Sequence, residues 1–283
     1  MILSPEIKKS IEQALQEDLE VRGDVTCNLL LPNEQIAQAV IVAKQGGVIA
    51  GTAVACEVFK TQDARLQTFN LIQDGAQVQP DSNILKISGS VKSILSAERT
   101  ALNFLQRLSG IATMTQRFVA CTKGTAAKIL DTRKTSPGLR RLEKYAVRVG
   151  GGVNHRMGLF DMILIKENHL QAAGSITAAV NRIRLMLQKR GENFKIEVEC
   201  TNLQQVKEAL NLMVDQIMLD NMTESDIYRA VEIVQGKVKL EVSGGVHLEN
   251  VARLAKTGVD FISVGALTHS APAMDLSLLL ESP

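Results

Sequence analysis

Short apolar runs alternate with amphipathic stretches through the second half of the sequence, and this alternation limits the fold more than any other feature. From Lys128 onward the apolar runs are KILDT, MILIK, KIEVE, QIMLD, KLEVS and FISVG, and helical patterns such as TNLQQVKEALNLM and HLENVARLAKTG separate the later ones. Strands that alternate with helices form parallel sheets with right-handed crossovers. The pattern therefore predicts an α/β fold whose sheet closes as a barrel or stays open and doubly wound.

Polar or small residues end four of these runs at a regular spacing. Glu199, Asp220, Ser243 and Gly265 recur at intervals of 21, 23 and 22 residues, one strand and one helix each. In a barrel the carboxyl ends of the strands meet at one mouth, where catalytic groups sit. Six strands are clear, so an eight-stranded barrel would need short strands hidden elsewhere, for example in VNHRM (153–157).

The first part of the chain has a different pattern of predicted helices and strands. An amphipathic stretch begins at Pro5, and AVIVAK (39–44), TFNLI (68–72) and NILKI (83–87) are typical of strands. A long helical pattern follows from Ser93 to Thr122. These features predict an α+β module that a long helix joins to the α/β part.

Composition excludes several classes of protein. The 32 Lys and Arg balance 30 acids to a net charge of +2, and Trp is absent, which excludes the broad cationic surface and the stacking platforms of a nonspecific nucleic-acid binder. No apolar run reaches the roughly 18 residues that span a bilayer. The first residues also lack the apolar block of a signal peptide. We therefore expect a cytoplasmic protein with neither nucleic-acid nor membrane partners.

The cysteines give no sign of a disulfide framework or a zinc site. They are far apart and form no CxxC pair: Cys27, Cys56, Cys121 and Cys200. We expect reduced and mostly buried thiols.

Positive charge concentrates between residues 133 and 166, where eight Lys and Arg accompany two acids. Arg133 and Lys134 follow the run KILDT and Lys166 ends the run MILIK, so all three are expected to face the barrel mouth. Because removing several cations from water is costly, we expect a multiply anionic ligand to neutralise them.

The other cations of this stretch fall into two groups. Arg140, Lys144 and Arg148 lie four residues apart, and this spacing predicts a solvated helix face. His155 and Arg156 follow three consecutive glycines, which allow the backbone to approach a ligand closely. This second pair is a candidate for a functional role.

Two interpretations of Glu199 and Asp220 remain open. The first makes them internal ion-pair partners of Lys134 and Lys166. The second has them hold Mg²⁺ beside anionic phosphates, since Mg²⁺ prefers carboxylate oxygens and keeps water ligands.

Two glycine turns follow predicted strands, SGG (243–245) and SVGA (263–266). Backbone N–H groups in such turns can cradle a phosphate, and neighbouring strand-to-helix loops of a barrel are a usual place for it.

Several of these segments together resemble the quinolinate phosphoribosyltransferase family: SAERTALNFLQRLSGIAT (96–113), DTRKTSPGLRRLEKYAVRVGGGVNHRMGLFDMILIKENH (131–169), EVEC (197–200), IMLDN (217–221), EVSGG (241–245) and ISVGA (262–266). The resemblance implies an N-terminal α/β sandwich domain over 1–112 and an incomplete, seven-stranded α/β barrel over 113–267. The segment 268–283 is expected to pack back on the first domain. The resemblance also implies a homodimer, or a multiple of dimers, in which the first domain of one subunit completes the site of its neighbour.

The same resemblance implies roles for individual residues. The expected ligands of quinolinate are Arg99 from the partner subunit, with Arg133, His155, Arg156 and Lys166. The expected ligands of phosphoribosyl pyrophosphate are Lys134, Glu199, Asp220, Ser243, Gly244, Gly245 and Gly265. Lys134, Lys166, Glu199 and Asp220 would be catalytic, and Glu199 and Asp220 would also hold Mg²⁺, directly or indirectly.

The activity implied is transfer of a phosphoribosyl group to quinolinate with decarboxylation, which yields nicotinate mononucleotide, pyrophosphate and CO₂ for NAD synthesis. Three alternatives remain. Lys166 at a strand end would also suit a Schiff-base aldolase, although the many arginines argue against it. A related protein associated with molybdate transport and a non-catalytic phosphate-ligand sensor are the others.

Overall fold

The computed structural model describes residues 3–281 and divides the chain into two compact units. The first unit comprises Met1–Gln116, Thr135–Gly151 and Thr268–Pro283, and the second comprises Arg117–Lys134 and Gly152–Leu267. The segment Thr135–Gly151 thus belongs to the first unit, whereas the bounds implied by the family resemblance included it in the barrel domain.

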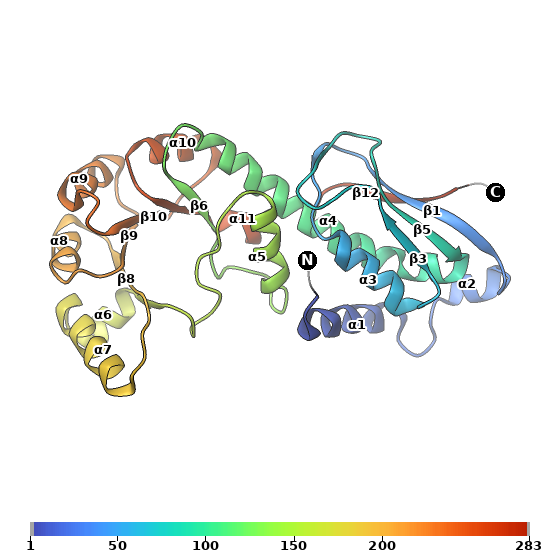
Figure 1. The fold of residues 1–283 in the computed structure, drawn as a ribbon, viewed down its shortest axis with the longest axis horizontal. Helices are drawn as coiled ribbons and strands as arrows, with labels where there is room; N and C mark the ends of the chain where they lie inside the picture. Colours follow the sequence, from blue (N-terminus) through green and yellow to red (C-terminus); the bar gives the residue numbers. More distant parts are fainter. Residues whose placement is uncertain (1–2, 282–283) are drawn as a thin grey trace. The chain divides into compact units, whose positions relative to one another are not determined.

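A four-stranded antiparallel sheet forms the first layer of the first unit (Figure 1). In spatial order its strands are β12 (Leu276–Leu280), β1 (Ile36–Ala43), β5 (Asn83–Ser90) and β3 (Gln67–Asn70). The strands predicted at 39–44, 68–72 and 83–87 are confirmed. The segment near the C-terminus adds an edge strand, because residues 276–280 pair with 39–43. A separate two-stranded ribbon joins β2 (Gly47–Val48) to β4 (Gln77–Val78).

Helices form the second layer of the first unit. They are α1 (Pro5–Leu19), α2 (Val25–Leu30), α3 (Thr52–Gln62), α4 (Val91–Cys121) and α5 (Arg140–Val149). Of these, α1, α3 and α4 lie along this sheet, whereas α5 lies away from it (Figure 1). The predicted amphipathic stretch is α1, which buries Ile7, Ile11 and Leu15 at helical spacing. The long predicted helix is α4, and a Cβ at its Gly110 would overlap the carbonyl of Pro272, so glycine lets the two segments meet.

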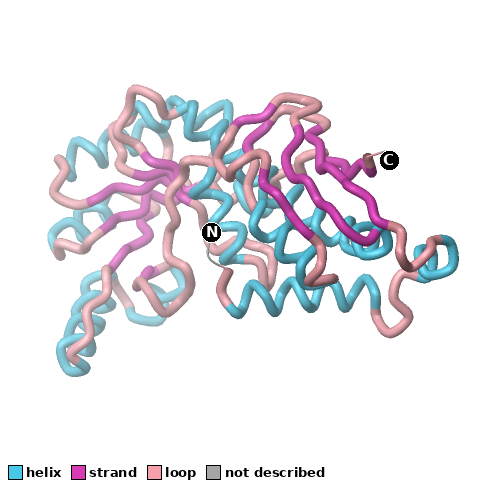
Figure 2. The backbone as a smooth tube through the Cα atoms, turned by 45° about the vertical axis from the view of Figure 1, so that its right-hand side comes forward, coloured by secondary structure: helices cyan, strands magenta, loops and turns pink. Residues whose placement is uncertain are grey.

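Parallel strands form the sheet of the second unit (Figure 2). Their spatial order is β6 (Lys128–Leu130), β11 (Phe261–Ser263), β10 (Lys239–Ser243), β9 (Gln216–Asp220), β8 (Ile196–Cys200) and β7 (Ile163–Ile165). Val153 adds a short parallel bridge to Leu130 on the outer side of β6. In the described part of the chain, β6 and β7 are the ends of this order and do not pair. The prediction of an incomplete α/β barrel is confirmed, although over residues 3–281 its sheet has six strands and only the Val153 bridge stands where a seventh was expected.

Helices follow the strands β7 to β11. They are α6 (Glu167–Ala173), α7 (Ile176–Arg190), α8 (Leu203–Asn211), α9 (Glu224–Val234), α10 (Leu248–Lys256) and the short α11 (Ala266–His269). Those from α6 to α10 lie outside the sheet and connect its strands (Figure 1). Between residues 3 and 281, no helix is both long and apolar enough to cross a membrane. Cys27 and Cys200 are buried, Cys56 and Cys121 are partly exposed, and all four are free thiols.

The solvated helix face predicted for Arg140, Lys144 and Arg148 is wrong for Lys144. Arg148 is exposed, but the Lys144 side chain is 0% exposed. The neighbouring residues Glu143 and Ala146 are also buried. Because α5 packs into the first unit over most of its circumference, a four-residue spacing of cations does not mark a surface here.

Candidate active site

The strand ends of the second unit bring the predicted acids and glycine turns to one end of the sheet. Glu199, Asp220 and Ser243 are at the carboxyl ends of β8, β9 and β10, and Ser243 pairs directly with Asp220 across the parallel ladder. Gly265 follows β11. This is the arrangement that the regular spacing predicted.

Lys166 and Glu199 form an ion pair at this end of the sheet. Lys166 follows β7 as the N-cap of α6, and its Nζ donates to Glu199 Oε2 at 2.5 Å. The lysine side chain is 47% exposed, whereas the glutamate is mostly buried. The ion-pair interpretation of Glu199 is therefore correct for this partner. Asp220 instead accepts a hydrogen bond from Asn221 Nδ2 at 2.8 Å.

Gly244 allows the loop after β10 to lie against the loop after β9. Its φ of +90° is in the left-handed region, and a Cβ there would overlap the side chain of Asn221. The backbone N–H of Asn221 donates to Ser243 O at 3.0 Å. The space around Gly245 is open. The turn thus exposes backbone at a strand end, as a phosphate cradle requires.

Asp131 ties the segment before His155 to the end of β6. Its buried carboxylate accepts from Asn154 Nδ2 at 2.5 Å and from the backbone N–H of His155 at 2.9 Å. Arg133 and Lys134 follow it immediately. The sequence analysis missed Asp131, although an acid at the end of the run KILD was a visible signal.

Arg156 and Arg133 form a local concentration of positive charge. Burial and the nearby charge of Arg133 lower the pKa of the Arg156 guanidinium, while Glu197 and Asp161 oppose this shift. One guanidinium nitrogen of Arg156 donates to Met162 O at 3.2 Å. Two neighbouring guanidinium groups are suited to a ligand with more than one carboxylate.

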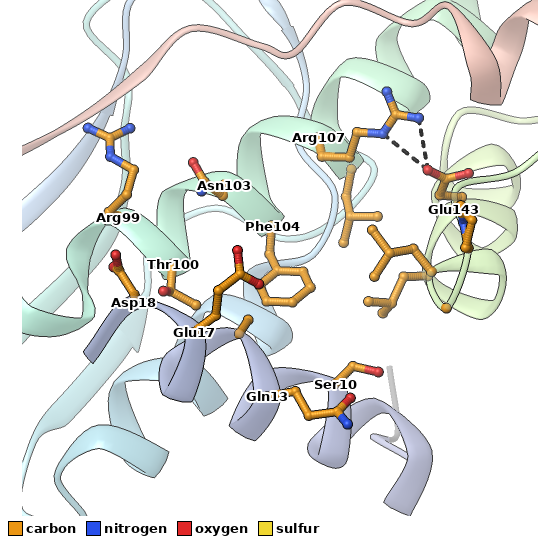
Figure 3. A pocket seen from close by; sticks show the side chains of 16 residues that line it. Ser10, Gln13, Glu17, Asp18, Arg99, Thr100, Asn103, Phe104, Arg107 and Glu143 are labelled. Carbon is orange, nitrogen blue, oxygen red and sulfur yellow. Dashed lines mark hydrogen bonds and ion pairs between the residues drawn. The ribbon is translucent and has the colours of Figure 1, made fainter. Parts of the chain in front are cut away.

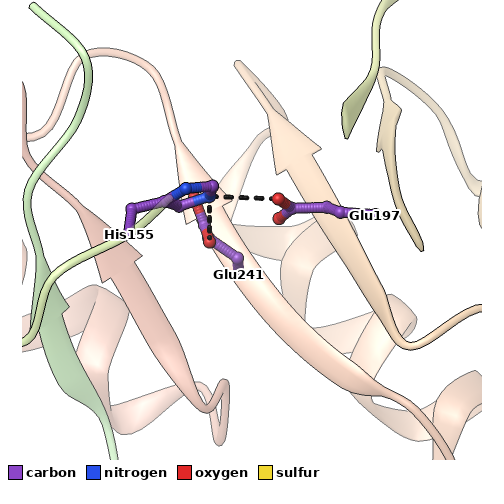
Figure 4. A group of neighbouring side chains, drawn as sticks. All are labelled: His155, Glu197 and Glu241. Carbon is purple, nitrogen blue, oxygen red and sulfur yellow. Dashed lines mark hydrogen bonds and ion pairs between the residues drawn. The ribbon is translucent and has the colours of Figure 1, made fainter. Parts of the chain in front are cut away.

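His155 is held by two buried glutamates, Glu197 and Glu241, that the sequence analysis also missed (Figure 4). Its Nε2 lies 3.0 Å from Glu197 Oε2 and 3.4 Å from Glu241 Oε2. Gln216 Nε2 donates to both carboxylates, at 2.8 and 2.6 Å, and Ser263 Oγ donates to Glu241 at 2.5 Å. We call Glu197, Glu241 and Ser263, with the half-buried Gln216, the buried cluster. Acids inside apolar strands, in IEVEC and KLEVS, were the available signal.

The buried cluster changes the protonation of His155. Burial by itself would lower the pKa of His155, but hydrogen bonds and negative charge from Glu197 and Glu241 outweigh it and raise this pKa. Burial and the charge of Glu197 raise the pKa of Glu241 to about 7. These contacts favour a proton on Nε2, which faces both carboxylates, and leave Nδ1 to accept from the backbone N–H of Arg156.

Arg99 is the only predicted site residue that belongs to the first unit. It is exposed on α4 and lines a cavity of about 540 Å³ (Figure 3). Residues of α1 such as Glu17 and Asp18 line the same cavity, and Arg107 and Glu143 form an ion pair within it.

Comparisons with known proteins agree with this arrangement. The family model described as "Quinolinate phosphoribosyl transferase, C-terminal domain" matches residues 111–279. The model of the N-terminal domain of the same family matches residues 24–109. The chain belongs to the quinolinate phosphoribosyl transferase family.

Individual members of this family are similar over nearly their whole length. A chloroplastic nicotinate-nucleotide pyrophosphorylase [carboxylating] of Arabidopsis thaliana is 42% identical over 98% of this chain and 83% of its own. A probable nicotinate-nucleotide pyrophosphorylase [carboxylating] of Bacillus subtilis is 42% identical over 96% of this chain and 93% of its own. The solved structure of the nicotinate-nucleotide pyrophosphorylase from Francisella tularensis has a TM-score of 0.94 and 42% identity, over 99% of this chain and 98% of that one.

Proposed function

We propose that this family member transfers the phosphoribosyl group of phosphoribosyl pyrophosphate to quinolinate with loss of CO₂, as a step of NAD biosynthesis. The products are nicotinate mononucleotide, pyrophosphate and CO₂. The observation that carries this proposal is the collection of cations and carboxylates at one end of the second unit's sheet, in a chain of this family.

Quinolinate is expected to bind against the guanidinium groups of the second unit. Arg133 and Arg156 are close enough for the charge of one to lower the pKa of the other, and a dicarboxylate relieves this repulsion. Lys166 adds positive charge beside them, and His155 is expected to contact quinolinate next to Arg156. We propose that Arg99 of a partner subunit completes the set in a homodimer.

Phosphoribosyl pyrophosphate is expected to bind along the neighbouring strand ends. The turn at Ser243, Gly244 and Gly245, with Gly265 of the next loop, offers backbone N–H groups to the 5′-phosphate. Glu199 and Asp220 can accept hydrogen bonds from the ribose hydroxyls. Lys134, which is exposed after β6, can neutralise the pyrophosphate.

The chemistry needs positioning and charge rather than a covalent nucleophile. The lone pair of the pyridine nitrogen forms a bond to the anomeric carbon, and the electron pair of the breaking C–O bond leaves with pyrophosphate. The quaternised ring then accepts the electron pair of the C–C bond that breaks when the 2-carboxylate departs as CO₂. A proton from solvent takes the place of the carboxylate on that ring carbon. Fixed cations stabilise the leaving group, and a carboxylate stabilises the positive ribosyl centre.

Mg²⁺ fits this site through the hard oxygens of Glu199 and Asp220, on adjacent strands. One oxygen of Glu199 already accepts from Lys166. We therefore propose that the ion, bound with pyrophosphate, is held mainly through water and the ligand. When bound, Mg²⁺ supplies positive charge that stabilises the departing pyrophosphate.

An aldolase is less consistent with the geometry. The Lys166 ammonium donates to Glu199, whereas a Schiff-base lysine attacks as a free amine. A sensor that binds phosphoribosyl pyrophosphate without turnover would need no clamp for a dicarboxylate. The cytoplasmic location stays a prediction.

The direct test is an assay of nicotinate mononucleotide formation from quinolinate, phosphoribosyl pyrophosphate and Mg²⁺. Nicotinate, which has one carboxylate, should be a poor substrate, because an unpaired buried guanidinium costs several kcal/mol. Turnover of nicotinate comparable to that of quinolinate would contradict the proposal, as would binding of both ligands without product.

A further inference from the structure

The interior of the second unit carries polar side chains one layer below the strand ends. Glu197 precedes Glu199 by two residues on β8, and Glu241 precedes Ser243 by two on β10, so each pair faces the same side of the sheet. Both inner glutamates are 0% exposed. Burying two carboxylates lowers the stability of the fold, because apolar side chains would fill the same space at lower cost. Their presence here therefore points to a specific role.

Every carboxylate oxygen of the inner pair accepts a hydrogen bond. Glu197 uses Oε1 for Gln216 and Oε2 for His155, and Glu241 uses Oε1 for Ser263 and Oε2 for Gln216. An amide side chain has one acceptor and one donor group. Glutamine in place of either glutamate would therefore turn N–H groups toward another donor, although its shape is nearly the same.

The far side of the His155 ring connects this layer to the substrate end. Nδ1 accepts from the backbone N–H of Arg156 at 2.6 Å, while the His155 backbone N–H is fixed by Asp131 at 2.9 Å. The His155 side chain is only 7% exposed. It thus connects the buried cluster to Arg156, whose guanidinium is a proposed ligand of quinolinate.

We propose that Glu197 and Glu241, with Gln216 and Ser263, are positioning residues that set the orientation of the His155 ring and, through it, the backbone of Arg156 at the quinolinate site. This inference rests on the proposed function. The buried cluster should matter for quinolinate more than for phosphoribosyl pyrophosphate, because the His155 ring that it holds contacts the backbone of Arg156. Glu241 and Ser263 lie on the strands that carry the 5′-phosphate turns, but their side chains contact each other and Gln216 rather than those turns.

A metal ion is the competing explanation, since one ligand atom from each of His155, Glu197 and Glu241 lies within 4.8 Å of the others. The amide of Gln216 argues against it. Its N–H groups donate to both carboxylates, and Gln216 approaches Glu241 Oε2 at 2.6 Å, where a cation would have to displace it.

The test compares Glu197→Gln and Glu241→Gln with wild type in steady-state kinetics. Asp215→Asn is the matched control: it is also an acid-to-amide change, beside Gln216, and the remaining oxygen can still accept from Ile196 N. We expect the KM for quinolinate to rise about tenfold or more in the two Glu variants, and the KM for phosphoribosyl pyrophosphate to change less than about twofold. Asp215→Asn should leave both values near wild type.

The kinetic results distinguish the positioning role from its alternatives. Equal rises in both KM values, or a fall in kcat alone, would overturn the positioning role. If the Glu variants fail to fold, Ser263→Ala removes one donor from Glu241 and should still raise the quinolinate KM selectively. Stoichiometric metal in purified wild type that is lost in Glu241→Gln would establish the metal explanation instead.

A measurement on the resting protein keeps the inference independent of activity. With four histidines in the chain, ¹⁵N-histidine NMR can identify the His155 ring by its loss in His155→Gln. We expect a protonated Nε2 whose hydrogen exchanges slowly with solvent, and faster exchange in Glu197→Gln. A rapidly exchanging or unprotonated Nε2 in wild type would refute the positioning role, whereas a protected Nε2 in a protein that does not use quinolinate would refute only the proposed function.

Discussion

At the scale of single residues, the second unit uses alternate positions of a strand for different tasks. On β8 the carboxyl end carries Glu199, which pairs with Lys166, and two residues earlier Glu197 contacts His155. The layers inside an α/β barrel are usually filled by branched apolar side chains. A buried polar layer under the strand ends departs from this pattern, and the positioning role proposed above would account for it.

The Mg²⁺ dependence of activity should trace to the outer acids. Glu199→Gln and Asp220→Asn each keep the side-chain shape and remove a negative charge, so the Mg²⁺ concentration for half-maximal activity should rise. Turnover should fall by about tenfold or more, which corresponds to at least ~1.4 kcal/mol of transition-state stabilisation. A Mg²⁺ titration of activity measures both effects.

A control for this titration is Asp260→Asn, which removes the carboxylate that pairs with Lys239 Nζ at 2.6 Å at the other end of the strands. It should leave the midpoint unchanged. If Glu199→Gln and Asp220→Asn lower the melting temperature but also leave the midpoint unchanged, these acids are ion-pair partners only and do not serve the metal.

At the scale of elements, one arginine joins three segments of the first unit. Arg107 of α4 donates to the buried Glu143 of α5 at 2.8 Å and to the backbone carbonyls of Thr268 and Ala271. Glu143 also accepts from Ser136 N at 3.1 Å. The ends of Thr135–Gly151 and of the C-terminal segment are thereby fastened to the long helix.

Arg107→Ala should reduce the free energy of unfolding by about 3 kcal/mol, because it leaves the Glu143 carboxylate buried without its ion-pair partner. Urea denaturation of wild type and variant measures this loss. Arg65→Ala is the control, since Arg65 is 88% exposed in its ion pair with Asp63 and its loss should change stability little. Equal effects of the two substitutions would show that the Arg107 pair has no special structural role.

At the scale of the whole molecule, the proposed site needs residues from both units. Arg99 belongs to the first unit and Lys166 to the second. In a symmetric dimer, each subunit can give Arg99 to its partner and receive the partner's in return. Such an arrangement would make activity a property of the assembly.

Mixed subunits test this sharing. Arg99→Ala and Lys166→Ala should each be inactive while remaining folded. A mixture that exchanges subunits freely should recover up to about a quarter of wild-type activity, because half of the dimers are mixed and each holds one intact site. Absence of recovery, with exchange shown by an independent fluorescent label, would place Arg99 in its own chain's site or outside catalysis.

The sequence by itself determined the elements and the residues at their ends. The strand-helix alternation predicted the six parallel strands, and α4 closely follows the predicted helix 93–122. The spacing of Glu199, Asp220 and Ser243 correctly predicted their common edge. These inferences succeed because helix and strand periodicity depend on neighbours along the chain.

Tertiary structure decided burial and partners. Nothing near Lys144 in the sequence indicates that α5 is enclosed, and His155 and Glu197 meet across a separation of 42 residues. The sequence also did not indicate which lysine, Lys134 or Lys166, would pair with Glu199, and the structure shows Lys166. A side chain's water access and its hydrogen-bond partners depend on which distant segments the fold brings against it, and local periodicity carries no information about them.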